Sequence, residues 1–329
     1  MTRSRSGSWL QGGTGMAAAQ ADWSGIYHGD FTDVEKIRRH LDAGADPVGE
    51  LWGYETPLHE AAKQGSPEVV SELASRAHDV DALCQGRSAL WNAVYHRRAD
   101  NVSALLEQGA DPWRPMMNGW SPGRLGQVGP CDFGAAPEGH RLTEEERALA
   151  ESGPELARML SDLFYDGFSL ACVANVTAAE AVQRLDDDGL IVVDGRVPWP
   201  DLPFSEELDI IGVTDVPGGC VLAQPWAYRA QTPGVISAVT AGTFAYGMYA
   251  NPKSGNQGCI VENGRVIGWD LHPGYDPYSD ATARDVLAAY ASCGNATVHC
   301  MVYAGLRPET ADCLEHPDVW LRLAANTSE

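Results

Sequence analysis

The chain has 329 residues and a formal net charge of −22 at pH 7. This length is enough for two domains, each with a core of its own. So acidic a surface repels phosphate, which makes nucleic acid and anionic membranes unfavourable partners and favours a protein partner that is basic or neutral.

Other features of the sequence indicate the cellular compartment of the protein. The N-terminus lacks an apolar leader, and no run of residues approaches the length of a membrane span. The eight cysteines are not closely paired, as they are in a disulfide framework. We therefore expect a cytoplasmic protein. Residues 1 to about 15 are rich in Ser, Arg and Gly without periodicity, which predicts a disordered tail over residues 1–20, and Met16 is an alternative start.

The first strong local signal is the stretch Tyr54–Ala62, which reads YETPLHEAA. Thr56 is placed to cap a helix that begins at Pro57, where the fixed φ and the missing N–H of proline do no harm. Leu58 and Ala61 then begin a thin apolar stripe, which lets a neighbouring helix approach closely.

The features around this stretch recur at a fixed interval. Gly44-Ala45-Asp46-Pro47 returns as Gly109-Ala110-Asp111-Pro112, with Ala77-His78-Asp79-Val80 between them, so the aspartates lie 33 and 32 residues apart. Helix openings keep the same step at Thr56-Pro57-Leu58, Ser88-Ala89-Leu90 and Ser121-Pro122-Gly123. This pattern resembles the ankyrin repeat, whose T-P-L-H-x-A signature has a period of about 33 residues. The resemblance implies a solenoid that binds proteins through its loop tips and concave face.

The array is expected to span residues 21–139, with about three and a half repeats. The first repeat is incomplete, with Trp23–Tyr27 in place of its inner helix, and the fourth decays into the Gly-rich stretch Gly123–Gly139. Residues 140–164 carry two capping boxes, Thr143 with Glu146 and Ser152 with Glu155. They predict two helices that cap the array and bridge it to a second domain.

The second domain is expected over residues 165–329. Apolar runs predict strands at Phe168–Val176, Ile210–Val216, Cys220–Trp226, Ile236–Thr240 and Thr243–Ala250. Asn263-Gly264 favours a type I′ hairpin turn, and helical patterns follow at residues 282–292, 296–303, 308–314 and 317–323. Short turns between consecutive strands favour an antiparallel sheet. The predicted fold class is α+β: an all-α ankyrin solenoid followed by an antiparallel-sheet α+β domain.

This second domain carries a further resemblance. Leu170–Asp186, Val216–Leu222, Ser237–Thr243 and the hairpin that leads to Trp269-Asp270 resemble a family of actinobacterial domains of unknown function. Those domains also open on V-x-x-V-(S/T)-x-x-E-x-x-x-R-L and carry a hairpin that ends in a Phe/Trp-Asp turn. The resemblance covers residues 165–325 and implies a fold and an actinobacterial source, with no activity to carry over.

Aromatic and arginine side chains are favoured anchors of protein interfaces. Six such residues fall at loop tips or on inner helices of the repeats and are predicted to contact a partner: Trp52, Tyr54, Arg87, Trp91, Tyr95 and Trp120. Exposed inner-helix positions are also expected at Glu60, Lys63, Asn92 and His96. The alternative is that half of the six pack against a neighbouring repeat. Trp91, which replaces the histidine of the signature, would then fill space between repeats.

Residues that could carry chemistry form weaker patterns. The acidic loop after Asp270 lacks the spacing of a calcium loop. Near the C-terminus, Cys313-x-x-His316 is one close pair, whereas a zinc site normally has two. We therefore expect no metal and no cofactor, and we assign no catalytic residue. Five aromatic residues could line a ligand groove on the sheet, with ordinary sheet packing as the alternative: Trp226, Tyr228, Trp269, Tyr246 and Tyr249. The first three are the candidate groove residues.

Two hypotheses follow from these patterns. The first is a non-enzymatic adaptor, regulatory or immunity-like protein whose array holds a protein partner. The second is an enzyme or small-ligand module in the C-terminal domain, to which the array delivers a substrate. A pocket in the C-terminal domain with a strongly perturbed pKa would favour the second.

Overall fold

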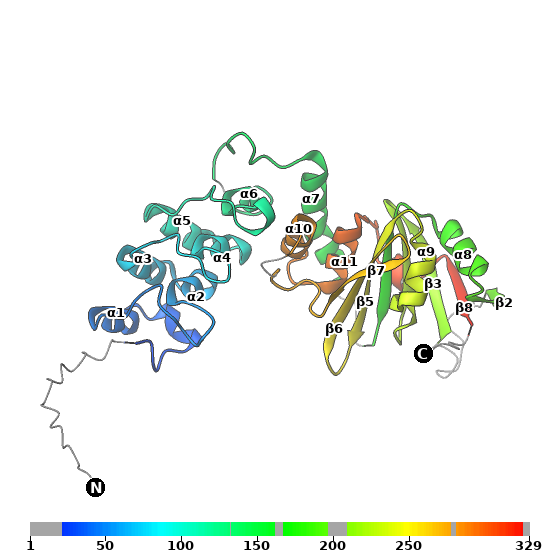
Figure 1. Ribbon diagram of the computed structural model, residues 1–329, viewed down its shortest axis with the longest axis horizontal. Coiled ribbons are helices and arrows are strands. Elements are labelled where there is room, and N and C mark those ends of the chain that lie inside the picture. The colour runs from blue at the N-terminus through cyan, green and yellow to red at the C-terminus, as the bar shows by residue number, and fades with distance from the viewer. Residues whose placement is uncertain (1–21, 132, 162–166, 197–208, 278–280, 325–329) are drawn as a thin grey trace, which may run out of the picture. The chain divides into compact units, whose positions relative to one another are not determined.

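The computed structural model describes residues 22–131, 133–161, 167–196, 209–277 and 281–324, without the side chains of residues 193–196. The tail expected over residues 1–20 lies outside these ranges. The chain forms two compact units, Met1–Pro112 and Trp113–Glu329 (Figure 1). The boundary falls inside the span that we expected for the array, so the decaying fourth repeat packs within the second unit.

The first unit is all-helical and built from repeated helix pairs. The elements are η1 (His28–Thr32), α1 (Val34–Asp42), α2 (Pro57–Gln64), α3 (Pro67–Arg76), α4 (Ala89–Tyr95) and α5 (Ala99–Glu107). Inner helix α2 packs against α4, and outer helix α3 packs against α5. Trp23–Tyr27 do not form the inner helix that we expected for the first repeat. Gly25 has a φ of 77°, which a right-handed helix does not allow, and the chain makes the 3-10 turn η1 instead.

Local sequence signals explain where these helices begin. The hydroxyls of Thr56, Ser66 and Ser88 accept hydrogen bonds from backbone N–H groups three residues on, which confirms the expected caps at Thr56 and Ser88. His59 ties two repeats together, because its Nε2 donates to the carbonyl of Arg87 at 2.9 Å. Its Nδ1 therefore accepts from the Thr56 hydroxyl at 2.7 Å. Burial lowers the pKa of His59, which favours this neutral form.

The second unit is built on one eight-stranded sheet. Its strands are β1 (Ser169–Ala174), β2 (Ile191–Arg196), β3 (Ile210–Val216), β4 (Gly219–Gln224), β5 (Phe244–Asn251), β6 (Gly255–Glu262), β7 (Arg265–Asp270) and β8 (Val319–Leu323). The strand order is β2-β8-β3-β4-β1-β5-β6-β7, and the neighbouring strands run antiparallel. The α+β fold class is therefore confirmed.

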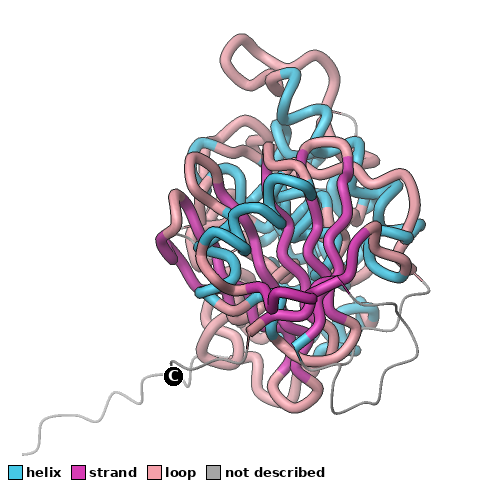
Figure 2. Tube along the Cα trace, turned by 90° about the vertical axis from the view of Figure 1, so that its right-hand side faces the viewer, coloured by secondary structure: helices cyan, strands magenta, loops and turns pink. Residues whose placement is uncertain are grey.

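Helices cover both faces of this sheet (Figures 1 and 2). The helical elements of the unit are η2 (Met117–Gly119), α6 (Pro122–Gly126), α7 (Glu144–Met159), α8 (Ala178–Asp187), η4 (Arg229–Gln231), α9 (Pro233–Val239), α10 (Ala283–Ala291), α11 (Ala296–Ala304) and α12 (Asp312–Glu315). Helices α8 and α9 bury Leu185 and Ile236 against the sheet face that carries Ala171 and Ala245. The adjacent residue Tyr246 points to the opposite face, where it contacts His299 of α11.

Three predictions for this unit were wrong. Ile236–Thr240, expected as a strand, lies largely in α9, because Pro233 begins a helix there and its apolar residues meet one face of the sheet. Residues 317–323, expected as a helix, contain β8, which pairs with β3. The two helices expected over residues 140–164 are one helix, α7. Ser152 lies inside it and bonds back to the carbonyl of Leu149.

The close contact between α7 and α10 gives the first testable prediction. A Cβ atom at Gly153 would lie 2.2 Å from the carbonyl oxygen of Ala291, which is backbone and cannot rotate away. Gly153→Ala is expected to lower the free energy of unfolding by about 1–3 kcal/mol. Gly234→Ala in α9 is the control, because nothing lies within 4 Å of that Cβ. It should change stability by less than about 1 kcal/mol, in the stabilising direction. Equal urea midpoints for the two variants would contradict the steric argument.

Candidate functional site

An aromatic group lies at the tip of the second repeat. Residues Leu51 and Glu55 close a hairpin through an isolated β-bridge, and Trp52 and Gly53 at its tip have φ values of 56° and 82°. The Trp52 indole N–H donates to the carbonyl of Ile26 at 3.2 Å, which fixes the ring beside the first repeat. The ring centroids of His28 and Tyr54 lie 4.2 and 6.3 Å from that of Trp52. Tyr54 is 55% exposed, so it presents an apolar ring to solvent.

Two nearly buried carboxylates lie beside this aromatic group. Glu55 and Glu60 are only 6% and 5% exposed. Lys63 forms an ion pair with Glu55 and approaches Glu60 at 4.0 Å, while His28 and Gln64 hydrogen-bond to Glu60. Lys63 therefore lies close to both carboxylates. The ion pair between Lys63 and Glu55 joins inner helix α2 to the hairpin, so the hairpin tip and the helix form one surface.

The hairpin of the third repeat is fastened to that of the second. The Gln85 carboxamide donates to the carbonyl of Tyr54 at 2.8 Å, and the Arg87 guanidinium donates to the Gln85 side chain at 3.1 Å. Leu83 beside them is exposed. These bonds hold Tyr54 in place, so the aromatic group is a rigid feature of the first unit.

The six predicted partner contacts do not all reach the surface. Tyr54 is exposed, and Trp52, Arg87 and Tyr95 are half-buried. Trp91 is fully buried between helices, where it fills space as the alternative reading expected. Trp120 lies in the second unit and is also fully buried, with its indole N–H on the carbonyl of Ala283 at 3.0 Å. Side chains with no exposed area cannot anchor a partner, so neither tryptophan belongs to the proposed surface.

The inner-helix positions divide in the same way. His96 is exposed, as expected, but Lys63 is half-buried and Glu60 and Asn92 are buried. Sequence reasoning also missed Tyr27 and His28, which are both exposed, and the His28 ring contacts that of Trp52. The break in the first repeat was the available signal, because a missing inner helix leaves its residues free to lie over the next hairpin.

A second aromatic group lies on the sheet of the second unit. The rings of Tyr228 and Tyr249 meet edge to face at 6.0 Å. Trp269 on β7 is opposite Cys259 on β6, which is opposite Gly247 on β5, so Trp269 shares a sheet face with Tyr249 two residues along β5. Tyr228 reaches that face through its contact with Tyr249, and Trp226, two residues earlier in the chain, is also exposed. The structure thus brings Tyr228 and Trp269, two of the three candidate groove residues, to one face.

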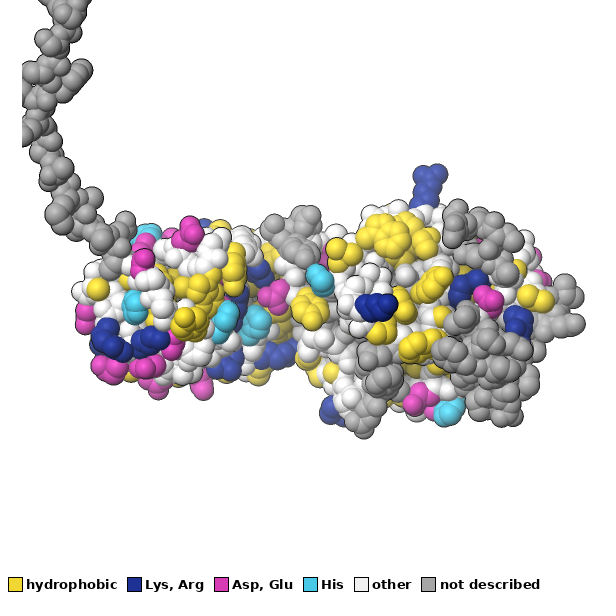
Figure 3. Space-filling view, turned by 90° about the horizontal axis from the view of Figure 1, so that it is seen from below, with side chains coloured by type: hydrophobic (Ala, Val, Ile, Leu, Met, Phe, Trp, Pro, Cys, Tyr) yellow, Lys and Arg dark blue, Asp and Glu magenta, His cyan; other side chains and the backbone are white. Residues whose placement is uncertain are grey.

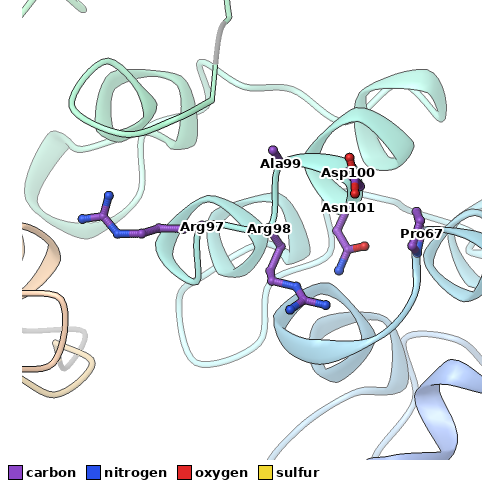
Figure 4. A pocket seen from close by; sticks show the side chains of 6 residues that line it. All are labelled: Pro67, Arg97, Arg98, Ala99, Asp100 and Asn101. Atoms are coloured by element: carbon purple, nitrogen blue, oxygen red, sulfur yellow. The ribbon is translucent and has the colours of Figure 1, made fainter.

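A pocket of about 360 Å³ lies at the opposite ends of the repeat helices, lined by Pro67, Arg97, Arg98, Ala99, Asp100 and Asn101. Figure 4 shows the Arg97 and Arg98 side chains pointing in different directions. Arg98 donates to the carbonyl of Gly65 at 3.2 Å, and Asn101 donates to the same carbonyl at 3.1 Å. The polar groups therefore hold the helices together rather than converge on a ligand.

The second unit buries several titratable groups. Burial raises the pKa of Cys220 and Cys313 to about 12, and thiols in that state are poor nucleophiles and poor metal ligands. Burial lowers the pKa of His299 to about 4, although the nearby carboxylates of Asp270 and Asp285 favour its charged form. Within the described ranges, no three His, Cys, Asp or Glu residues are grouped to hold a metal ion. Asp280 of the acidic loop lies outside those ranges.

Comparison with known proteins identifies the repeat region of the first unit. Residues 26–116 match a family model described as ankyrin repeats, in three copies. The N-terminal region is therefore an ankyrin array, a class of fold that mediates protein–protein interactions. A comparison with curated proteins found no match. Among the described residues, no helix is both long and apolar enough to cross a membrane.

Proposed function

We propose that the ankyrin array binds a protein segment that carries a Lys or Arg residue next to an apolar side chain. The observation that carries this proposal is the exposed Tyr54 ring beside the nearly buried carboxylates of Glu55 and Glu60. Two carboxylates close to one lysine leave this place with negative charge, which attracts a basic side chain of a partner. That side chain could also stack on an aromatic ring, which adds about 0.5–1 kcal/mol at an exposed site.

The charge of the whole chain supports the same partner. A net charge of −22 attracts basic proteins, over distances of about 10 Å at about 0.1 M salt. An adaptor, regulatory or immunity-like protein of the cytoplasm fits such a surface, because it works by holding a partner and needs no catalytic group. The second unit then offers a separate surface to the assembly.

The test is a selection of random peptides displayed against the full-length protein. Peptides retained by the wild type are expected to share a Lys or Arg beside an apolar residue, and their affinity should fall as salt rises. Tyr54→Ala should weaken the selected peptides at least tenfold, since exposed tyrosines are frequent anchors of interfaces. Glu60→Gln should weaken the binding of these peptides less than Tyr54→Ala does, and it should make their affinity less dependent on salt.

Tyr228→Ala provides the matched control. Tyr228 is 54% exposed, almost the same as Tyr54, but it belongs to the second unit. This variant should bind the selected peptides as the wild type does. Peptides without a basic residue, or equal binding by the Tyr54→Ala variant, would contradict the proposed surface.

A further inference from the structure

The aromatic group of the second unit has no role in the function proposed above. It consists of Trp226, Tyr228, Tyr249 and Trp269, and we call it the sheet platform. Figure 3 shows the hydrophobic side chains that gather on one face of this unit. Trp269 is 62% exposed and Trp226 is 40% exposed, which is unusual for residues that proteins normally bury in large part.

The backbone holds the platform rigidly. Ala227, between two of the aromatic residues, has a φ of 103°, a strained conformation for a residue with a side chain. The strain is supported by a hydrogen bond of 2.7 Å from the Ala227 N–H to the carbonyl of Gly167. A Cβ atom at Gly167 would lie 2.4 Å from the Trp226 ring, so this glycine lets the indole approach the backbone closely. Strain of this kind is concentrated at functional sites, where the fold keeps side chains in place for a ligand.

Amide side chains lie between the rings. Gln257 on β6 is opposite Tyr249 and shares its face of the sheet. Gln231 lies over Cys259, the residue opposite Trp269, and its Oε1 accepts from the Cys259 thiol at 3.5 Å. Carboxamides both donate and accept hydrogen bonds, so they suit a ligand rich in hydroxyl groups.

The four aromatic side chains of the platform are uncharged, although the chain is strongly acidic. Arg229, the charged residue nearest in sequence to Tyr228, is buried and forms an ion pair with Asp209 at 2.8 Å. The platform therefore matches an uncharged ligand and gives no advantage to a basic or acidic one.

The edge of the sheet disfavours a peptide as that ligand. Strand β7 is an edge strand, but its register with β6 shifts beside Ile260 and Val261. Such a bulge twists an edge away from an added strand. A flat ligand that lies on the aromatic rings meets no such obstacle.

We propose that the sheet platform binds a neutral carbohydrate chain. Sugar rings would stack on Tyr228, Tyr249 and Trp269 through their apolar C–H faces, and their hydroxyl groups would hydrogen-bond to Gln231 and Gln257. This site is independent of the peptide surface on the array. It would bring a protein partner and a glycan onto one chain.

The test is binding of the full-length protein to an array of neutral glycans, followed by calorimetric titration with the best oligosaccharide. The wild type is expected to bind at least one class of neutral glycan, with less than a twofold change in affinity between 0.05 and about 0.5 M salt because no charges pair. Trp269→Ala and Tyr228→Ala should each lower the affinity for the oligosaccharide at least tenfold, whereas Tyr54→Ala should bind it as the wild type does. Circular dichroism and thermal unfolding check that each variant is folded.

The outcomes separate the two proposed sites. Tyr54→Ala should weaken only the binding of peptides, and Tyr228→Ala should weaken only the binding of the glycan. Either proposal can therefore fail while the other stands. The carbohydrate proposal is overturned if the wild type binds no neutral glycan, if binding survives the Tyr228→Ala/Trp269→Ala double variant, or if proline-rich peptides bind the platform instead.

Discussion

Asn101→Ala is expected to lower the stability of the first unit by about 2–3 kcal/mol. The Asn101 side chain is buried, and its Nδ2 lies 3.1–3.3 Å from the carbonyl oxygens of Ala61, Ala62 and Gly65. These carbonyls lie at the C-terminal end of α2, where the helix itself supplies few N–H donors. The Gly65 N–H also bonds to the Ala61 carbonyl, and Arg98 bonds to the Gly65 carbonyl. Alanine would remove the donor that the three carbonyls share. The tie joins the third repeat to the second, and such interfaces supply most of the stability of a repeat array.

Hydrogen exchange of the amides in α2 through α5 is the measurement, because it reports the opening of this unit separately from the other. Ser103→Ala is the control on the same helix, since the Ser103 hydroxyl is exposed and bonds only within α5. It should change the opening free energy by less than about 0.5 kcal/mol. Similar exchange in the two variants would show that the bonds of Asn101 add little.

The array could be predicted from the sequence because its signals are local. Thr56 and Ser88 cap helices, and Pro57 begins one, as the spacing indicated. Exposure could not be predicted in the same way, because it depends on what lies above a side chain. Trp91 is covered by the neighbouring helices, whereas Tyr54, in the hairpin of the preceding repeat, is exposed to solvent. Residue type alone does not separate these two cases.

The hairpin of the second unit was also encoded locally. Asn263 and Gly264 have φ values of 49° and 74°, both positive as a type I′ turn requires, and β6 pairs with β7 around them. The strand order was not encoded locally. Strand β1 lies between β4 and β5, and β8 lies between β2 and β3, so both pairings join segments far apart in the chain. Short apolar runs such as Val235–Val239 fit a buried strand as well as a buried helix, which is why α9 was misread.

The sheet platform combines both kinds of information. The sequence singled out Trp226, Tyr228, Tyr249 and Trp269, together with Tyr246, as aromatic residues near predicted strands. The register of β5 with β6 and the ring contact to Tyr228 place Tyr249 on the face of the platform, whereas Tyr246 points to the opposite face. The flanking amides were not recognisable either, because Gln231 reaches Cys259 through the packing of η4 on the sheet.

Acidification is expected to destabilise the second unit through His299. Its side chain is buried, its Nδ1 has no hydrogen-bond partner, and the rings of Tyr246 and Tyr303 lie 5.1 and 6.2 Å away. Burial lowers the pKa of His299 to about 4, whereas the unfolded chain has a pKa near 6.5. Between these values the unfolded state binds the extra proton. The free energy of unfolding therefore falls as pH falls through this window, by on the order of 3 kcal/mol in total.

The variant His299→Phe separates this effect from general acid denaturation. Phenylalanine keeps a ring between the two tyrosines but cannot bind a proton. Urea unfolding is measured at pH 7.0 and at about pH 5.0. The free energy of unfolding should fall between these values in the wild type, and it should fall less in the variant. The difference should be roughly 1.36 kcal/mol per pH unit at most. His316→Ala, which removes an exposed histidine of the same unit, should keep the wild-type pH dependence. If His299→Phe keeps it as well, the titrating group is not His299, and the carboxylate of Asp270, which accepts from the Tyr246 hydroxyl at 2.5 Å, becomes the next one to replace.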